Sequence, residues 1–189
     1  MQKRSLVKND KDRMKTKYIY DTCKMKNIIL FSVLFCFCNA QQTANTDHKE
    51  IPMEVNRLMN NWHQDAADAN LGTYIGLMHS TCNYIGTDAT ENWKRDEFAA
   101  FCKPYFDNKT TWDFTTMQRD VRVNEAGNTA WFDEILDTHM GTCRGSGALE
   151  LKNGEWKLMQ YVLSVAVPNE SMEAVKRAKS EADSVYKFK

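Results

Sequence analysis

Between residues 112 and 167, apolar and polar side chains alternate with a period of two, and three short turn signals interrupt the alternation. A period of two is typical of β-strands with one buried face, and turns this short join antiparallel neighbours. The pattern predicts four strands of an antiparallel meander, over 112–123, 129–138, 143–151 and 156–167. Pro168 is expected to end the last strand, because proline has no N–H to donate to a ladder.

The residues before the meander have helical spacing instead. Apolar side chains recur every three or four positions between Val55 and Ala69, which predicts an amphipathic helix over about 52–70. A short strand is expected over 81–85. A second helix is expected over 94–106, with four residues on one side: Phe98, Phe101, Cys102 and Tyr105. This order predicts an α+β domain with the helices on one face of an antiparallel sheet.

The first 40 residues differ in composition from the rest of the chain. They hold nine Lys and Arg against three Asp and Glu, which leaves 16 basic and 22 acidic residues in 41–189. The acidic balance of the body argues against nucleic acid as a partner.

Residues 28–37 are apolar except for Ser32, follow two lysines and precede Cys38-Asn39-Ala40. This is the layout of a secretory signal, and ten residues are too few for a transmembrane helix. Met25 begins a more typical leader, so it is an alternative start. Cleavage after Ala40 would give a soluble exported protein, periplasmic or secreted, whereas lipidation of Cys38 or Cys36 would give a membrane-anchored lipoprotein.

The chain is therefore expected to have four parts. An N-terminal extension with the signal peptide occupies 1–40, a polar tether 41–51, one domain 52–168 and a C-terminal helix 169–189. Asn169 or Ser171 is expected to cap that helix. Its apolar positions are expected to turn inward: Ala174, Val175, Ala178 and Ala182.

Three cysteines follow the leader: Cys82, Cys102 and Cys143. They are expected to be small buried hydrophobic residues with at most one disulfide. Their spacing does not match a zinc site, so no metal and no cofactor are expected.

The predicted hairpin tip at Asn153-Gly154 sets a register for the neighbouring strands. Leu151 should oppose Trp156, and Gly147 should then lie between Gln160 and Asp133. This register places Trp131, Asp133 and Gln160 on the inner face beside two glycines, Gly145 and Gly147. Missing side-chain volume and polar groups together predict a pocket rather than a filled core.

A register slip of one residue is the alternative, because it exchanges the two faces of a strand. Glu134 would then replace Asp133, and Tyr161 or Met159 would replace Gln160, with the glycines marking a bulge. In the preferred register Arg144 is expected to form a surface ion pair with Glu134. His63 is expected to be an exposed or half-buried structural residue.

Motifs of well-marked enzyme classes are absent from the sequence. There is no nucleophile elbow, zinc-protease helix, phosphate loop or dinucleotide fingerprint. His79 and Cys82 lie three residues apart in a predicted strand or loop, which does not hold them as a base and a nucleophile.

Several segments resemble the nuclear transport factor 2-like superfamily, and most closely its SnoaL-like branch of small exported bacterial proteins. The segments are Trp131-Phe132-Asp133-Glu134, Cys143-Arg144-Gly145-Ser146-Gly147-Ala148-Leu149 and Gly154-Glu155-Trp156-Lys157-Leu158. The resemblance covers about 52–168, including the helix with Trp62. It implies a cone-shaped, curved antiparallel sheet wrapped around helices, a pocket in the mouth of the cone and a homodimer formed through the sheet.

The resemblance leaves function open, because the same fold hosts isomerases, cyclases, dehydratases and binding modules. The first hypothesis is a module that binds a small, largely apolar molecule, with six candidate residues: Trp131, Asp133, Gln160, Trp112, Tyr84 and Trp62. The second is an isomerase, cyclase or dehydratase with Asp133 as the acid or base, the role that a pocket Asp plays in enzymes of this superfamily. The third is a non-catalytic interaction domain with a filled cone.

Overall fold

The structure, a computed structural model, describes residues 50–187. The predicted signal peptide, the alternative start at Met25, the Cys38 lipidation site and nearly all of the tether lie outside the described residues. All the described residues belong to one compact unit. Among the described residues, no helix combines the length and the apolar character needed to cross a membrane.

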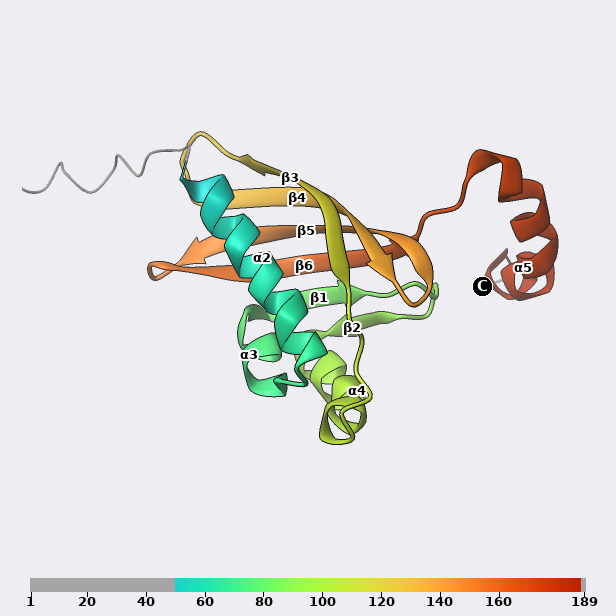
Figure 1. Cartoon of the computed structure of the whole chain (residues 1–189), viewed down its shortest axis with the longest axis horizontal. Helices are drawn as coiled ribbons and strands as arrows, with labels where there is room; N and C mark the ends of the chain where they lie inside the picture. The colour runs from blue at the N-terminus through green and yellow to red at the C-terminus, as the bar shows by residue number, and fades with distance from the viewer. Residues whose placement is uncertain (1–49, 188–189) are drawn as a thin grey trace, which may run out of the picture. The chain divides into compact units, whose positions relative to one another are not determined.

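Helices and strands follow the predicted order closely (Figure 1). The helices are α2 (Ile51–Ala67), α3 (Leu71–Gly76), α4 (Arg95–Asp107), the short 3-10 helix η1 (Asn169–Ser171) and α5 (Met172–Lys187). The strands are β1 (Met78–Ile85), β2 (Asn92–Lys94), β3 (Thr115–Val123), β4 (Thr129–Thr138), β5 (Gly141–Lys152) and β6 (Glu155–Val165). The four strands of the predicted meander are confirmed, and α3 and β2 are additions.

One six-stranded sheet carries the fold, in the order β2-β1-β6-β5-β4-β3. Strands β3 to β6 pair as antiparallel neighbours. Strand β1 pairs in parallel with β6, so the sheet is mixed rather than wholly antiparallel. Helix α2 crosses one face of the sheet, while α3 and α4 lie at the end that carries β1 and β2 (Figure 1).

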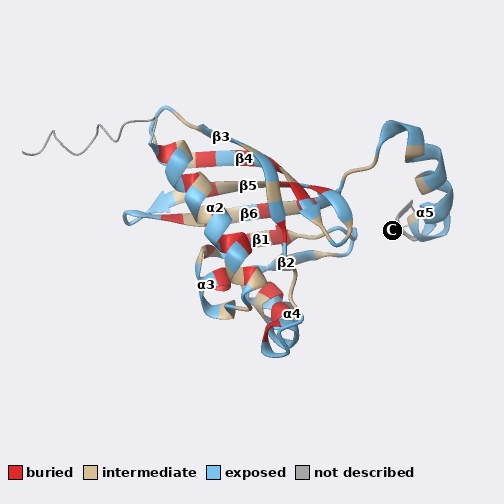
Figure 2. Ribbon diagram, in the orientation of Figure 1, coloured by how far each residue is buried: buried red, intermediate tan, exposed pale blue. Residues whose placement is uncertain are grey.

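The core lies between α2 and the face of the sheet that it covers (Figure 2). The predicted apolar stripe of α2 is buried: Ile51, Val55, Met59, Trp62 and Ala66. The indole Nε1 of Trp62 donates a 2.9 Å hydrogen bond to the carbonyl oxygen of Tyr74 on α3, and the two rings stack at 4.7 Å. A buried polar ring edge needs such a partner, so α3 is held against α2.

The hairpin tip forms as predicted. Asn153 (φ 52°) and Gly154 (φ 84°) both adopt positive φ, as a two-residue type I′ turn requires, and Leu151 pairs with Trp156. A β-bulge between Ala148 and Leu149 then shifts the register by one residue, so that Gly147 pairs with Tyr161 instead of Gln160.

The expected inner face is therefore wrong on β6 beyond the bulge, and on β4 it is wrong for a second reason, since β4 pairs with β5 one residue out of the expected register. Gly147 pairs with Phe132, and Gly145 pairs with Glu134, whereas Asp133 pairs with Ser146. Asp133, Gln160 and Trp131 are exposed on the outer face, because side chains alternate along a strand.

The C-terminal helix α5 does not bury the predicted positions. Ala174, Ala178 and Ala182 are exposed, and Val175 is half-buried. The helix offers mostly charged residues and alanines, which bury little apolar area, so its inward alanines were a wrong expectation.

Candidate functional site

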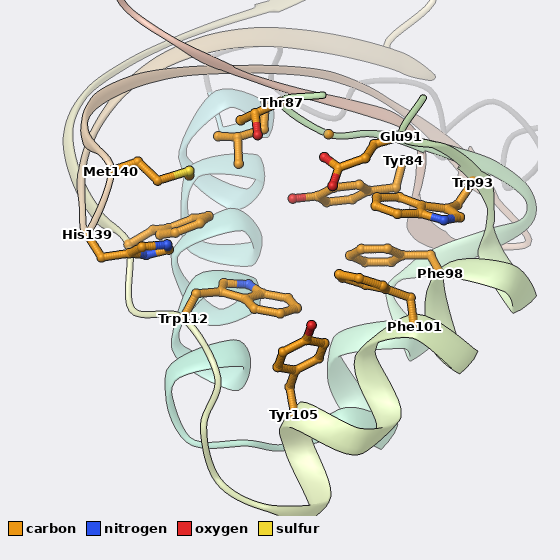
Figure 3. A pocket seen from close by; sticks show the side chains of 13 residues that line it. Tyr84, Thr87, Glu91, Trp93, Phe98, Phe101, Tyr105, Trp112, His139 and Met140 are labelled. Atoms are coloured by element: carbon orange, nitrogen blue, oxygen red, sulfur yellow. The ribbon is translucent and has the colours of Figure 1, made fainter. Parts of the chain in front are cut away.

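A pocket of about 230 Å³ opens beside α4, between the end of β1 and the turn that joins β4 to β5 (Figure 3). Most of its wall is aromatic: Tyr84, Trp93, Phe98, Phe101, Tyr105, Trp112 and Phe114. An engineered apolar cavity of roughly 150 Å³ is large enough for benzene. The pocket therefore has room for a molecule of one or two rings.

Helix α4 builds one wall of the pocket. Glu97 accepts a 2.8 Å hydrogen bond from the backbone N–H of Lys94, which fixes the first turn of the helix. Phe98 then stacks on Tyr84 of β1 at 3.8 Å, and Phe101 stacks on Trp93 of β2 at 4.7 Å. The predicted apolar side of α4 therefore has two roles. Phe98 is buried, whereas Phe101 and Tyr105 are partly open to the pocket.

The segment between α4 and β3 builds the opposite wall. Trp112 packs edge-on against Phe106 of α4 at 5.6 Å, which directs the indole into the pocket (Figure 3). Phe114 lies over His139 of the β4–β5 turn, with ring centroids 6.3 Å apart. This wall comes from residues without regular secondary structure, held by the packing of their rings.

Few polar groups reach the pocket, and they enter from different sides. The hydroxyls of Tyr84 and Tyr105 point into it, and the Glu91 carboxylate lies at its upper side (Figure 3). Glu91 Oε2 accepts a 3.1 Å hydrogen bond from the backbone N–H of Asp88. Burial, followed by neighbouring groups that include Glu91, raises the pKa of Tyr84, so its hydroxyl stays protonated.

A second polar group lies deeper, in the core rather than in the pocket. Glu134 on β4 is 1% exposed. Oε1 accepts a 2.8 Å hydrogen bond from the Tyr161 hydroxyl and lies 3.0 Å from Nε2 of His63, while Oε2 accepts a 2.8 Å bond from Nε of Arg119. Burial raises the pKa of Glu134, but His63, Arg119 and Tyr161 outweigh it and hold that pKa below its ordinary value.

Arg119 connects this group to the helix. Its Nη1 donates hydrogen bonds to the backbone oxygen of Asn56 and, at 2.8 Å, to Oδ1 of Asn60, both on α2. The network therefore ties β3, β4 and β6 to α2. Two expectations were wrong here: Glu134 pairs with Arg119 rather than with the exposed Arg144, and His63 is buried. Glu134 faces inward because of the β4–β5 register, and His63 meets it there from α2.

Comparison with known proteins identifies the family that has this architecture. The SnoaL-like domain family matches the chain over residues 55–168, which span α2 to the end of the sheet. The chain belongs to the SnoaL-like domain family. No curated protein sequence matches it.

Solved structures with the same fold come from proteins that are described in different ways. An NTF2-like protein of unknown function from Pseudomonas putida KT2440 is 16% identical, with 63% of this chain and 89% of that chain aligned and a TM-score of 0.53. The association domain of C. elegans CaMKII is 17% identical, with 64% and 100% aligned and a TM-score of 0.53. A candidate ketosteroid isomerase from Parabacteroides distasonis is 16% identical, with 68% and 95% aligned and a TM-score of 0.51. The SnoaL-like domain described here therefore has the nuclear transport factor 2-like fold.

The sequence-predicted site residues of this SnoaL-like domain separate into three groups. Tyr84 and Trp112 line the pocket, and Trp62 is a core residue. Trp131, Asp133 and Gln160 lie on the outer face of the sheet, away from the pocket. The bulge between β5 and β6 accounts for Gln160, whereas Trp131 and Asp133 face outward because β4 pairs with β5 one residue out of the expected register.

Sequence reasoning missed other lining residues. The spacing of Phe101 and Tyr105 on α4 was a usable signal, since it marks one side of a helix. Glu91 lies in a loop that the sequence marks only as a turn, so nothing in the local pattern shows that its carboxylate reaches the pocket.

The three cysteines are buried and free, in agreement with their expected role as small core residues. Burial raises the pKa of both Cys82 and Cys102 to about 12. Within residues 50–187, no three His, Cys, Asp or Glu side chains are grouped so that they could hold a metal ion.

Proposed function

We propose that this SnoaL-like domain binds a small, largely apolar molecule with one or two rings in the pocket beside α4. The observation that carries the proposal is the wall of seven aromatic side chains around a space of about 230 Å³. Ligand sites in proteins are typically concave, mostly apolar and provided with a few polar groups, which is the character of this pocket.

A catalytic role for Asp133 is not part of the proposal. Its carboxylate is 54% exposed and bonded to Arg122 on the outer face, so it cannot reach a molecule held in the pocket. Glu134, which replaces it on the inner face, is enclosed by His63, Arg119 and Tyr161. A buried carboxylate with all these partners stabilises the fold and has no open side for a substrate.

The test is calorimetric titration with 2-naphthol, a neutral two-ring probe. Tyr105→Ala removes a wall residue that is 41% exposed, and it should raise the Kd about fivefold with little effect on folding. Leu151→Ala is the matched control, because Leu151 is 39% exposed and lies outside the pocket. Absence of binding to the unmodified protein would favour the interaction domain instead.

We also propose that the domain forms a homodimer through the outer face of its sheet. Trp131 is 43% exposed there, and Ile135, Ala148 and Val162 alternate outward beside it. Exposed apolar side chains that adjoin on one face often mark an interaction surface. We further propose that the protein is exported, directed by the predicted signal at 28–40.

A further inference from the structure

We infer that the preferred ligand of the pocket is a small organic cation: an aromatic amine or quaternary ammonium compound. This inference rests on the proposed function, since it specifies the ligand of the same pocket. It is carried by the juxtaposition of the aromatic wall with the Glu91 carboxylate and the Tyr84 hydroxyl (Figure 3).

The charges around the pocket favour a cation over an anion. Among the described lining residues there is one carboxylate, Glu91, and no Lys or Arg. His139 also lines the pocket, from the β4–β5 turn, with the ring of Phe114 beside it. An anionic ligand would face Glu91 with no lysine or arginine in the lining to compensate, whereas a cationic ligand would supply the opposite charge.

The aromatic rings add attraction for the same sign of charge. Indole and phenol faces carry negative electrostatic potential, with Trp the strongest of the aromatic side chains. Trp93 and Trp112 line the pocket from different elements, and Figure 3 shows their rings on different sides of the space. A cation between them would contact more than one ring, as in the aromatic sites that recognise quaternary ammonium groups.

The Glu91 carboxylate is fixed by its own loop. The backbone N–H of Glu91 donates to the Asp88 oxygen at 2.9 Å, and the N–H of Gly86 donates to the Glu91 oxygen at 2.9 Å. A Cβ at Gly86 would overlap Oε2 of Glu91 and lie 3.0 Å from its Cβ, so a larger residue there would displace the carboxylate. The loop therefore holds the charge in place before any ligand arrives.

The Tyr84 hydroxyl supplies an independent observation. Tyr84 is 5% exposed and its hydroxyl points into the pocket, yet none of the described residues forms a hydrogen bond with it. Because the hydroxyl is open to the pocket, a bound molecule can reach it. Its oxygen can accept a hydrogen bond from the N–H of a protonated amine or lie against the methyl groups of a quaternary one.

The experiment compares phenyltrimethylammonium with tert-butylbenzene, which differ only in a charged nitrogen in place of a carbon. We expect the cation to bind the purified protein at least tenfold more tightly in low-salt buffer, with the preference weakening as salt is added. Glu91→Gln keeps an oxygen to accept the Asp88 hydrogen bond and should reduce the preference about fivefold. Asp137→Asn removes the same charge from an exposed position outside the pocket and should leave it unchanged.

The outcomes separate the two proposals. Equal binding of the two compounds, or tighter binding of the hydrocarbon, would overturn the cation inference and leave the pocket as an apolar site. The inference is also overturned if Glu91→Gln and Asp137→Asn alter the preference equally, because the effect would then be one of net charge. If 2-naphthol and both of these compounds fail to bind, the proposed function itself is wrong.

Discussion

The hydroxyl of Tyr161 on β6 donates a 2.8 Å hydrogen bond to the carboxylate of Glu134 on β4, although β5 lies between these two strands. The contact is possible because the residue of β5 beside them is Gly145, which has no side chain. The space left by the absent side chain of Gly145 is therefore occupied by a buried hydrogen bond and does not form a ligand pocket.

Gly145→Ala is expected to destabilise the domain. Its Cβ would lie 2.6 Å from Oε1 of Glu134 and would also contact the Tyr161 hydroxyl, so the buried hydrogen bond must break or the strands must separate. We expect a loss of about 1–3 kcal/mol in the free energy of unfolding, measured with urea. Gly72→Ala is the control, since Gly72 lies in α3 with nothing within 4 Å of the added Cβ, and it should be neutral or slightly stabilising. Equal effects of the two substitutions would contradict this account.

Glu134→Gln is expected to lower the unfolding free energy by about 3–5 kcal/mol at pH 7, because it leaves the Arg119 guanidinium buried without an opposite charge. The folded-state pKa of Glu134 lies below its ordinary value of 4.5. The Glu134 charge therefore gives its full stabilisation of the folded state above pH 4.5. That stabilisation is lost as the pH falls through the lower, folded-state pKa. Urea unfolding of both proteins between pH 7 and pH 3 should show the difference shrinking only in the acid range. A difference that stays constant to pH 3 would contradict the lowered pKa.

Tyr161→Phe tests the same group without removing a charge. The variant loses the hydroxyl that donates to Glu134 and keeps the ring that packs on Trp62 at 4.8 Å. Hydrogen bonds to buried charged groups contribute roughly 1.5–3 kcal/mol, so the expected loss lies in that range. Calorimetric melting would measure it, and an unchanged melting temperature would be inconsistent with the contact.

Cys82 and Cys102 are expected to resist thiol reagents in the folded protein. Burial raises the pKa of each to about 12, so about one molecule in ten thousand carries the thiolate at pH 8. A colorimetric thiol assay on the protein without its leader should detect almost no reaction in native buffer and three thiols per chain in guanidinium chloride. Rapid native reaction of either cysteine would contradict the burial.

Trp131→Lys is expected to convert the proposed dimer into a monomer. Trp131 lies on the outer face that we propose as the interface, and a buried unpaired lysine there would oppose association. Met53→Lys is the control, since Met53 is 65% exposed on α2 and not on the sheet. Sedimentation equilibrium should give twice the protomer mass for the unmodified protein and for Met53→Lys only. A monomeric unmodified protein would refute the proposed dimer.

Export predicts a processed N-terminus. When the gene is expressed with its leader in a bacterial host, the intact mass should correspond to a chain that begins at Gln41. A mass with an acylated Cys38 as first residue would indicate the lipoprotein alternative. Retention of residues 25–40 in the soluble fraction would be evidence against a cleaved signal.

Much of the fold could be predicted from local patterns. The period of the side chains located α2 and the four strands of the meander, and Asn153-Gly154 fixed the first pairs of the last hairpin. The sequence left a one-residue slip open as the alternative and could not decide between the two registers, because the extra residue of the bulge, Met159 of β6, is an ordinary strand residue. The bulge exchanged Gln160 for Tyr161 on the inner face, and a separate one-residue difference in the β4–β5 register exchanged Asp133 for Glu134.

The candidate site was less predictable than the fold. Tyr84 and Trp112 were identified because large aromatic residues are reasonable candidates anywhere near a pocket. Glu91 was missed because its position depends on the packing of its loop against Gly86. The parallel pairing of β1 with β6 was missed because residues far apart in sequence leave no local signal of their contact.

That parallel pairing has a consequence for how the protein is made. Strand β1 emerges from the ribosome early, but its central neighbour β6 is the last strand to be synthesised. Until residue 165 has left the exit tunnel, the aromatic residues of α2, α3 and β1 have no completed sheet to cover them. The sheet therefore cannot be completed until translation of the domain is nearly finished, and contacts this far apart in sequence are expected to slow folding.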